Sequence, residues 1–154
     1  MTRLSWEIKP FNGLALDELY DLLKLRGDVF VVEQRCAYGD LDEKDRHPET
    51  LHVTVRTGNG LLAAYLRILG PGVSYPDPSF GRLVVAPGFR GQGISHALVE
   101  KAVSLIQAQW PGRAVSIGAQ EYLEKFYVAH GFRPMSVPYL EDGIPHIDMT
   151  RNSG

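Results

Sequence analysis

The sequence has little of three features that mark large classes of protein. It contains a single cysteine, Cys36, which excludes an internal disulfide and agrees with a reducing cytoplasm. Its longest uninterrupted apolar run, Leu61–Leu66, is far shorter than the ~20 residues that a membrane-spanning helix needs. Neither sign of charge dominates, since the formal net charge is −2, so no basic surface for nucleic acid is expected. We therefore expect a cytoplasmic protein that binds neither membranes nor nucleic acid.

Apolar residues make up 44% of the 154 residues, which is enough for one domain spanning 1–154. The spacing of these residues predicts a helix over Leu16–Glu33 with a break or kink at Gly27, followed by a polar, irregular segment up to Thr50. A hairpin of Leu51–Thr57 and Leu61–Leu69 is predicted around the turn Gly58-Asn59-Gly60. Further strands are expected at Trp6–Lys9, Ala114–Ala119, Arg133–Val137 and His146–Thr150, and a further helix at Glu121–His130.

The segment Gly81–Ser95 is the most informative part of the chain. It begins as a short buried strand, continues through a glycine-rich turn, and ends as an amphipathic helix. A helix that begins at such a turn presents unpaired N–H groups and the positive end of its dipole, and glycines let a phosphate come close. Arg90 adds a fixed cation. The segment therefore predicts a ligand with a phosphate or pyrophosphate, against the alternative of an ordinary strand-to-helix connection.

Two standard phosphate-binding motifs are absent. No GxxxxGK run followed by Ser or Thr is present, which excludes a P-loop. A dinucleotide fingerprint requires Gly or Ala where this chain has His96, three residues after Gly93.

The pattern Arg90-x-x-Gly93-x-Ser95 resembles the acyl-CoA pyrophosphate loop of the GNAT superfamily of N-acetyltransferases. Ser95 stands where that superfamily usually has Gly or Ala, and it is small enough to keep the close approach. A later match is the aromatic helix with Tyr127, followed by Gly131-Phe132. Four further segments resemble the ElaA-like branch of the superfamily: Arg26–Gln34, Cys36-x-Tyr38, Asp42-x-x-Asp45 and the tail Asp142–Met149.

This resemblance implies a GNAT-like α/β (α+β) fold, in which helices flank a mixed, mostly antiparallel central sheet. It implies an enzyme that moves an acetyl group from acetyl-CoA directly to an amine of a small molecule, peptide or protein, without a metal. A non-catalytic acyl-CoA-binding or sensing domain on the same fold is the alternative. Neither the acceptor nor an oligomeric state follows from the sequence.

The resemblance also implies roles for particular residues. The loop residues Arg90, Gly91, Gln92, Gly93, Ile94 and Ser95 would hold the pyrophosphate, and the backbone of Leu83, Val84 and Val85 would hold the pantetheine arm. The N–H of Val85 would bind the thioester oxygen, and Gln120 would contact the pantetheine. Tyr127 matches the general acid that protonates the departing thiolate, with a packing role in an aromatic helix as the alternative.

The acceptor side of the site is predicted from three kinds of residue. Glu33 follows the apolar run Val29–Val32, where apolar walls would raise its pKa and make it a base; the alternative is an exposed carboxylate at a helix end. Asp42 and Asp45 would attract a cationic amine, unless they belong to an ordinary solvated loop. His146 would bind the acceptor, act as a base, or serve only as a hydrogen-bonded strand residue. Neither the acidic run nor the histidines have the spacing of a metal site.

Overall fold

The structure is a computed structural model that describes residues 3–153. Four antiparallel strands form its first sheet in the order in which they occur in the chain. These strands are β1 (Leu4–Pro10), β2 (Leu51–Thr57), β3 (Leu62–Leu69) and β4 (Ser79–Val85). The predicted hairpin is confirmed, since β2 and β3 pair directly across a turn that contains Gly60 with a φ of 88°.

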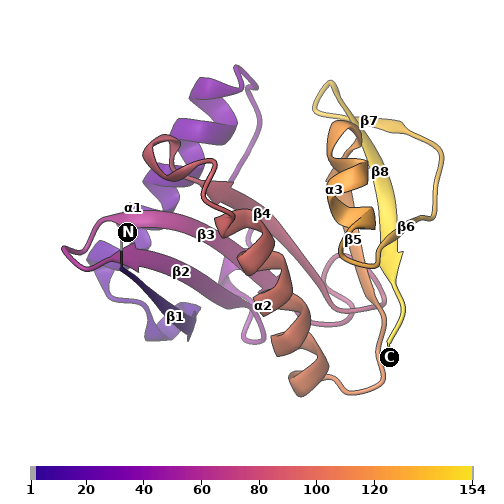
Figure 1. Cartoon of the computed structure of the whole chain (residues 1–154), viewed down its shortest axis with the longest axis horizontal. Helices are drawn as coiled ribbons and strands as arrows, with labels where there is room; N and C mark the ends of the chain where they lie inside the picture. The colour runs from indigo at the N-terminus through magenta and orange to yellow at the C-terminus, as the bar shows by residue number, and fades with distance from the viewer. Residues whose placement is uncertain (1–2, 154) are drawn as a thin grey trace.

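Helices cover both faces of this sheet. The long helix α2 (Ile94–Gln109) packs against Val53, Val55, Ala64 and Leu66 on one face (Figure 1). Helix α1 (Leu16–Arg26) packs on the other face, where Leu22 contacts Tyr65 and Val84. Because strand residues alternate between faces, Ala64 and Leu66 face α2 while Tyr65 faces α1.

The first helix does not break at Gly27. It continues as a π-helical segment, Gly27–Glu33, in which the N–H of Gln34 donates to the carbonyl of Val29 over 3.0 Å. The predicted break is therefore a change of hydrogen-bond spacing. Such π-helical turns occur frequently at functional sites.

The second sheet is built from the C-terminal part of the chain. Strand β8 (Ile144–Arg151) is central and pairs antiparallel with β5 (Val115–Gln120), β6 (Arg133–Pro134) and β7 (Tyr139–Glu141). The strand expected over Arg133–Val137 is wrong beyond Pro134. There the Oγ of Ser136 accepts the N–H of Asp148, 3.0 Å away, in place of a backbone carbonyl.

The helix expected over Glu121–His130 is a 3₁₀ turn, Glu121–Leu123, followed by the short helix α3 (Glu124–Val128). The predicted stop at Gly131 is confirmed, because its φ is 88° and the N–H of Phe132 donates back to the carbonyl of Tyr127 over 3.1 Å. This turn places Tyr127 and Phe132 in the same core cluster.

The two sheets touch at one end and separate at the other. Where β4 and β5 begin, the N–H of Ser116 donates to the carbonyl of Pro78 over 3.1 Å, but no ladder joins the strands. A bulge lies in β4, where Arg82 has a φ of 52° and the register against β3 shifts. A bulge bends a strand and increases its twist, so β4 turns away from β5 toward their carboxyl ends (Figure 1).

We expect Leu98→Ala, in the fully buried part of α2, to lower the free energy of unfolding by about 2–5 kcal/mol. The loss has two causes, a smaller apolar contact and a cavity between α2 and the sheet. Urea denaturation of the variant and the wild-type protein measures the difference. Leu16→Ala is the control, because the Leu16 side chain is 86% exposed and should change stability by less than about 0.5 kcal/mol. Equal effects of the two substitutions would contradict this position of the core.

Candidate active site

The turn before α2 forms a small pocket with the properties that the sequence predicts. Gly91 and Gly93 both have a φ of 79°, a conformation that glycine adopts without strain, and α2 begins immediately after them. A Cβ built on either glycine would meet no atom within 4 Å, so the space above the turn is open. The pocket has a volume of about 350 Å³ and is lined by Val85, Phe89, Arg90, Gly91, Gly93, Ile94, Ser95, His96 and Phe126.

Arg90 is held in place by two contacts beside this pocket. Its Nε donates to the carbonyl of Val85 over 3.2 Å. Its two terminal nitrogens donate to the carboxylate of Glu33 over 2.7 and 2.8 Å. Both side chains stay close to half exposed, so a phosphate can still approach the guanidinium.

The expectation of a raised pKa for Glu33 is wrong. Glu33 contacts a guanidinium instead of apolar walls, and the hydrogen bonds from Arg90 lower its pKa below the ordinary value of 4.5. Its surroundings favour the charged form, which makes it a weaker base than predicted.

One edge of β4 is free to bind an extended ligand. The N–H of Ala86 donates to the carbonyl of Ala63 on the β3 side over 2.8 Å. Because successive backbone groups point to opposite edges of a strand, the N–H and carbonyl of Val85 point toward β5. Arg90 occupies that carbonyl. The side chain of Val84 packs against α1 instead, so Val84 offers only its backbone to a ligand.

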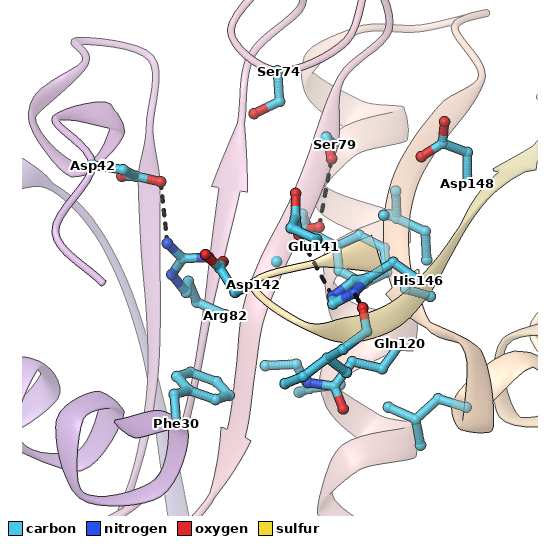
Figure 2. A pocket seen from close by; sticks show the side chains of 18 of the residues that line it. Phe30, Asp42, Ser74, Ser79, Arg82, Gln120, Glu141, Asp142, His146 and Asp148 are labelled. Carbon is cyan, nitrogen blue, oxygen red and sulfur yellow. Dashed lines mark hydrogen bonds and ion pairs between the residues drawn. The ribbon is translucent and has the colours of Figure 1, made fainter. Parts of the chain in front are cut away.

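A larger cavity of about 610 Å³ lies between the separated strands. It brings together five residues predicted for the site, namely Leu83, Gln120, Tyr127, Asp42 and His146. Figure 2 shows Asp42 and Arg82 on one side of this cavity, and His146, Glu141 and Asp148 on the other. Glu33 and Asp45 are not among the residues that line it.

Tyr127 lies at the boundary between core and cavity. Its ring packs against Phe80, Phe126 and Phe132, with centroids 5.0–6.2 Å away. Burial raises the pKa of the hydroxyl, which is therefore protonated at neutral pH. Among residues 3–153 no hydrogen-bond partner occupies this hydroxyl, so Tyr127 both packs and can donate a proton.

Asp45 does not attract a ligand. Its side chain is only 8% exposed, and its oxygens accept hydrogen bonds of 2.7 and 3.2 Å from Arg26, which is itself fully buried. Arg67 contributes a further contact of 3.1 Å to the same carboxylate. The prediction that Asp45 concentrates cationic amines is wrong because two arginines neutralise it inside the protein.

Asp42 lines the cavity but is also occupied. Arg67 donates to its two oxygens over 2.8 and 2.6 Å, and Arg82 lies 3.3 Å from one of them. Arg82 also pairs with Asp40, which in turn accepts from Arg26 over 2.8 Å. The prediction that Asp42 attracts an amine is wrong for the same reason as for Asp45. Three arginines and three aspartates form one network, which holds the segment Asp40–Asp45 against β3, β4 and α1.

His146 also has partners in the structure. Its Nδ1 lies 2.7 Å from the carbonyl of Ile144, and its Nε2 lies 3.5 Å from a carboxylate oxygen of Glu141. The ring stacks on Tyr139. His146 therefore forms part of the cavity wall, with one nitrogen next to an exposed carboxylate.

Three polar residues of the cavity were missed by the sequence analysis. The hydroxyls of Tyr75 and Tyr139 donate to the same oxygen of Asp148 over 2.9 and 2.7 Å. The alternation His146-Ile147-Asp148-Met149-Thr150 was a signal, because it places Asp148 on the same face as His146. No sequence pattern links Tyr75, which lies in the connection between β3 and β4, to this face.

Comparisons with known proteins agree with this fold. Residues 40–153 match the acetyltransferase (GNAT) domain family. The solved structure of an acyl-CoA N-acyltransferase from Pseudomonas aeruginosa is 41% identical, with a TM-score of 0.91 over 97% of this chain and 99% of that one. The crystal structure of Escherichia coli ElaA gives a TM-score of 0.90 at 36% identity, over 97% and 100% of the two chains. In sequence, ElaA of Escherichia coli K12 is 38% identical over 148 residues, 96% of either protein.

The chain therefore belongs to the GNAT family of acyltransferases. Within that family it belongs to the ElaA-like branch, as the separate sequence matches had predicted. The mixed fold with antiparallel sheets flanked by helices is confirmed as well. Within residues 3–153, no helix has both the length and the apolar character needed to cross a membrane. The same residues contain no group of three or more His, Cys, Asp or Glu side chains arranged to hold a metal ion.

The arginine–aspartate network should make stability depend on acidic pH. Burial by itself raises the pKa of Asp42, but Arg67 and Arg82 outweigh it and lower the pKa from the ordinary value of 3.8 to about 2. The stability that this carboxylate contributes is complete above pH 3.8 and is lost as pH falls toward 2. Between pH 3.8 and pH 2, we expect the free energy of unfolding of the wild type to fall by about 2 kcal/mol more than that of Asp42→Asn. Asp17→Asn, on the exposed surface of α1, is the control; identical pH slopes for Asp42→Asn and the wild type would contradict the network's role.

Proposed function

We propose that this protein is an acetyl-CoA-dependent N-acetyltransferase, that residues 1–154 form its single domain, and that it acetylates an amine. One observation carries the proposal. The pocket at the start of α2 and the larger cavity lie next to each other along β4 and α3, since Val85 and Phe126 line the pocket while Leu83 and Tyr127 line the cavity. A phosphate-bearing arm can therefore enter at the turn and bring its reactive end to Tyr127.

Cofactor binding would use the groups that the sequence predicts. Arg90 and the backbone N–H groups of Gly91–Ser95 bind the pyrophosphate at the positive end of α2. Leu83 offers its backbone groups to the amides of the pantetheine arm, as a neighbouring strand would, and the N–H of Val85 remains free for the thioester oxygen. Gln120, at the end of β5, lies on the opposite side of the cavity and contacts the same arm.

The chemical step needs no covalent intermediate on the protein. The neutral amine attacks the thioester carbonyl, and the N–H of Val85 binds the oxygen as it becomes negative. The carbon–sulfur bond then breaks, and the Tyr127 hydroxyl gives its proton to the leaving thiolate. Burial raises the pKa of the Tyr127 hydroxyl, so the hydroxyl carries the proton that the thiolate takes up. The amine loses its proton to water in the open cavity, and solvent restores the proton of Tyr127.

Glu33 has a different role in this scheme from the one first predicted. Its contact with Arg90 supports a positioning role, in which Glu33 holds the guanidinium beside Val85 before the pyrophosphate arrives. A direct role as proton acceptor stays a prediction, against which the lowered pKa of Glu33 counts.

Cofactor binding is tested by filling the pocket at the start of α2. We expect Gly93→Leu to abolish acetyl-CoA binding in isothermal titration calorimetry, because the side chain enters the space that the phosphate requires. Gly60→Leu is the matched control: this glycine also has a positive φ with nothing within 4 Å, so it imposes a similar strain far from the pocket. If both variants bind acetyl-CoA like the wild type, the pyrophosphate site is wrong. Should Gly93→Leu fail to fold, Arg90→Ala is expected to weaken binding by about 10- to 100-fold.

The role of Tyr127 is tested with Tyr127→Phe, which removes the hydroxyl and keeps the ring packing. We expect kcat to fall by about 100-fold or more while the Kd for acetyl-CoA stays unchanged, because the hydroxyl acts only on the leaving group. Steady-state kinetics and calorimetry measure the two quantities. Tyr20→Phe, an exposed tyrosine on α1, is the control. An unchanged single-turnover rate would assign Tyr127 to packing, and binding without turnover by the wild type would favour a non-catalytic acyl-CoA-binding protein.

A further inference from the structure

Asp148 lies on the cavity wall, where two tyrosines hold its side chain in place. It lies on β8 opposite Gly118 of β5, on the face of the second sheet that also carries His146 (Figure 2). Both tyrosine hydroxyls bind only one of its oxygens, Oδ1. Among residues 3–153, no donor binds Oδ2. One carboxylate oxygen is thus fixed in place while the other is left open to the cavity.

Gly118 is needed to build this arrangement. It does not have a positive φ, so glycine is not required there by backbone conformation. A Cβ at this position would lie 2.8 Å from the Tyr75 hydroxyl, closer than real Cβ contacts, and 3.2 Å from that of Tyr139, tighter than most of them. The absence of a side chain lets the two hydroxyls reach Asp148.

The two tyrosines stay protonated and keep donating to Asp148. Burial and the hydrogen bond to Asp148 raise the pKa of Tyr75, and the same two causes raise that of Tyr139 to about 12. Each hydroxyl oxygen also has lone pairs that can accept a hydrogen bond. With Oδ2 of Asp148, the site offers three acceptors, which matches the three donors of a primary ammonium group.

The charge of the rest of the cavity favours a cation. Arg67 and Arg82 belong to the network in which three arginines pair with three aspartates, so their charges are neutralised. Lys44 is then the remaining cation of the lining, and it donates to the hydroxyl of Ser74 over 2.7 Å. Three carboxylates, Glu141, Asp142 and Asp148, stand against this one charge.

Asp148 lies too deep to hold the amine that reacts. Strands β4 and β5 both begin beside the contact between Pro78 and Ser116. Gly118, the partner of Asp148, is two residues beyond that contact, whereas Val85 is seven residues beyond it on a strand with one bulge. The difference of about four residues corresponds to about 13 Å along the strands. The divergence of β4 from β5 adds to this distance, so one amine cannot reach both Asp148 and Val85, whereas a molecule with an amine at each end of an alkyl chain can place one amine at each point.

We propose that Asp148 Oδ2, with the hydroxyl oxygens of Tyr75 and Tyr139, binds the non-reacting ammonium group of a small diamine or polyamine, whose other amine receives the acyl group. This inference rests on the proposed N-acetyltransferase function and names its substrate class. The bound ammonium replaces water at one carboxylate and two hydroxyls, and its fixed position directs the free amine toward Val85 and Tyr127. A monoamine of equal length fills the same space without this contact.

The test compares cadaverine with pentylamine, which has the same carbon chain and lacks the second amine. For the wild-type protein we expect kcat/KM to be about 10- to 100-fold higher for cadaverine, the range of one charge-assisted contact. Asp148→Asn should lower the value for cadaverine to that for pentylamine. It should change neither the value for pentylamine nor the Kd for acetyl-CoA. Asp17→Asn, an exposed charge change on α1, should leave the preference intact.

Two further variants keep the test decisive if Asp148→Asn does not fold. Tyr75→Phe removes one acceptor and should reduce the preference for cadaverine in part. Gly118→Ala should reduce it by pushing both hydroxyls away from Asp148. Neither substitution touches the pocket at the start of α2, so both variants should bind acetyl-CoA like the wild type.

The outcomes separate this inference from the function on which it rests. If the wild-type protein acetylates neither compound nor the N-terminus of a test peptide, the proposed N-acetyltransferase function is wrong, and the diamine site with it. If the protein acetylates the peptide alone, or both alkylamines equally well, only the diamine site is overturned. The same holds if the Asp148→Asn variant keeps the preference for cadaverine.

Discussion

The unpaired edge of β4 is the constraint on which the rest of the site depends. In an ordinary sheet, β5 would take up the backbone groups of Val85, and no ligand could reach them. Here the bulge at Arg82 bends β4 beyond the hydrogen bond between Pro78 and Ser116, so that the edge opens toward a cavity of about 610 Å³. An exposed strand edge binds extended chains readily, which is the property that the proposed pantetheine contact uses.

The arginine–aspartate network keeps that opening in shape. Arg82 belongs both to the bulge and to the network, because it pairs with Asp40 and Asp42. The left-handed backbone of Arg82 is unfavourable for a residue with a side chain, and its ion pairs offset that penalty. Arg26 at the end of α1 pairs with Asp40 as well and also with Asp45, so the segment after the π-helical turn is tied to the bulged strand. Buried charges that are all paired add little net stability, but they specify one arrangement of the loop.

Sequence reasoning succeeded where a local pattern sets the structure. The glycines and the amphipathic spacing around Gly91–Ser95 predicted a turn and a helix start, and the structure has both. It failed for Glu33, Asp42 and Asp45, because the sequence shows the charge of a side chain but not its partners. Each of these carboxylates pairs with an arginine that lies 19 to 57 residues away along the chain.

The sequence by itself determined the family, the order of most elements and the position of the glycine-rich turn before α2, because these depend on neighbouring residues. Only the tertiary structure decided which charges remain open to a ligand. Asp148 and Tyr75 are 73 residues apart and meet because the first and second sheets touch at their starting ends. Asp42 and Asp148 both line the cavity, yet two arginines occupy Asp42 while one oxygen of Asp148 stays open. The physical reason is that a carboxylate binds whatever donors the fold brings within about 3 Å, and that distance is set by the packing of strands and helices from the whole chain.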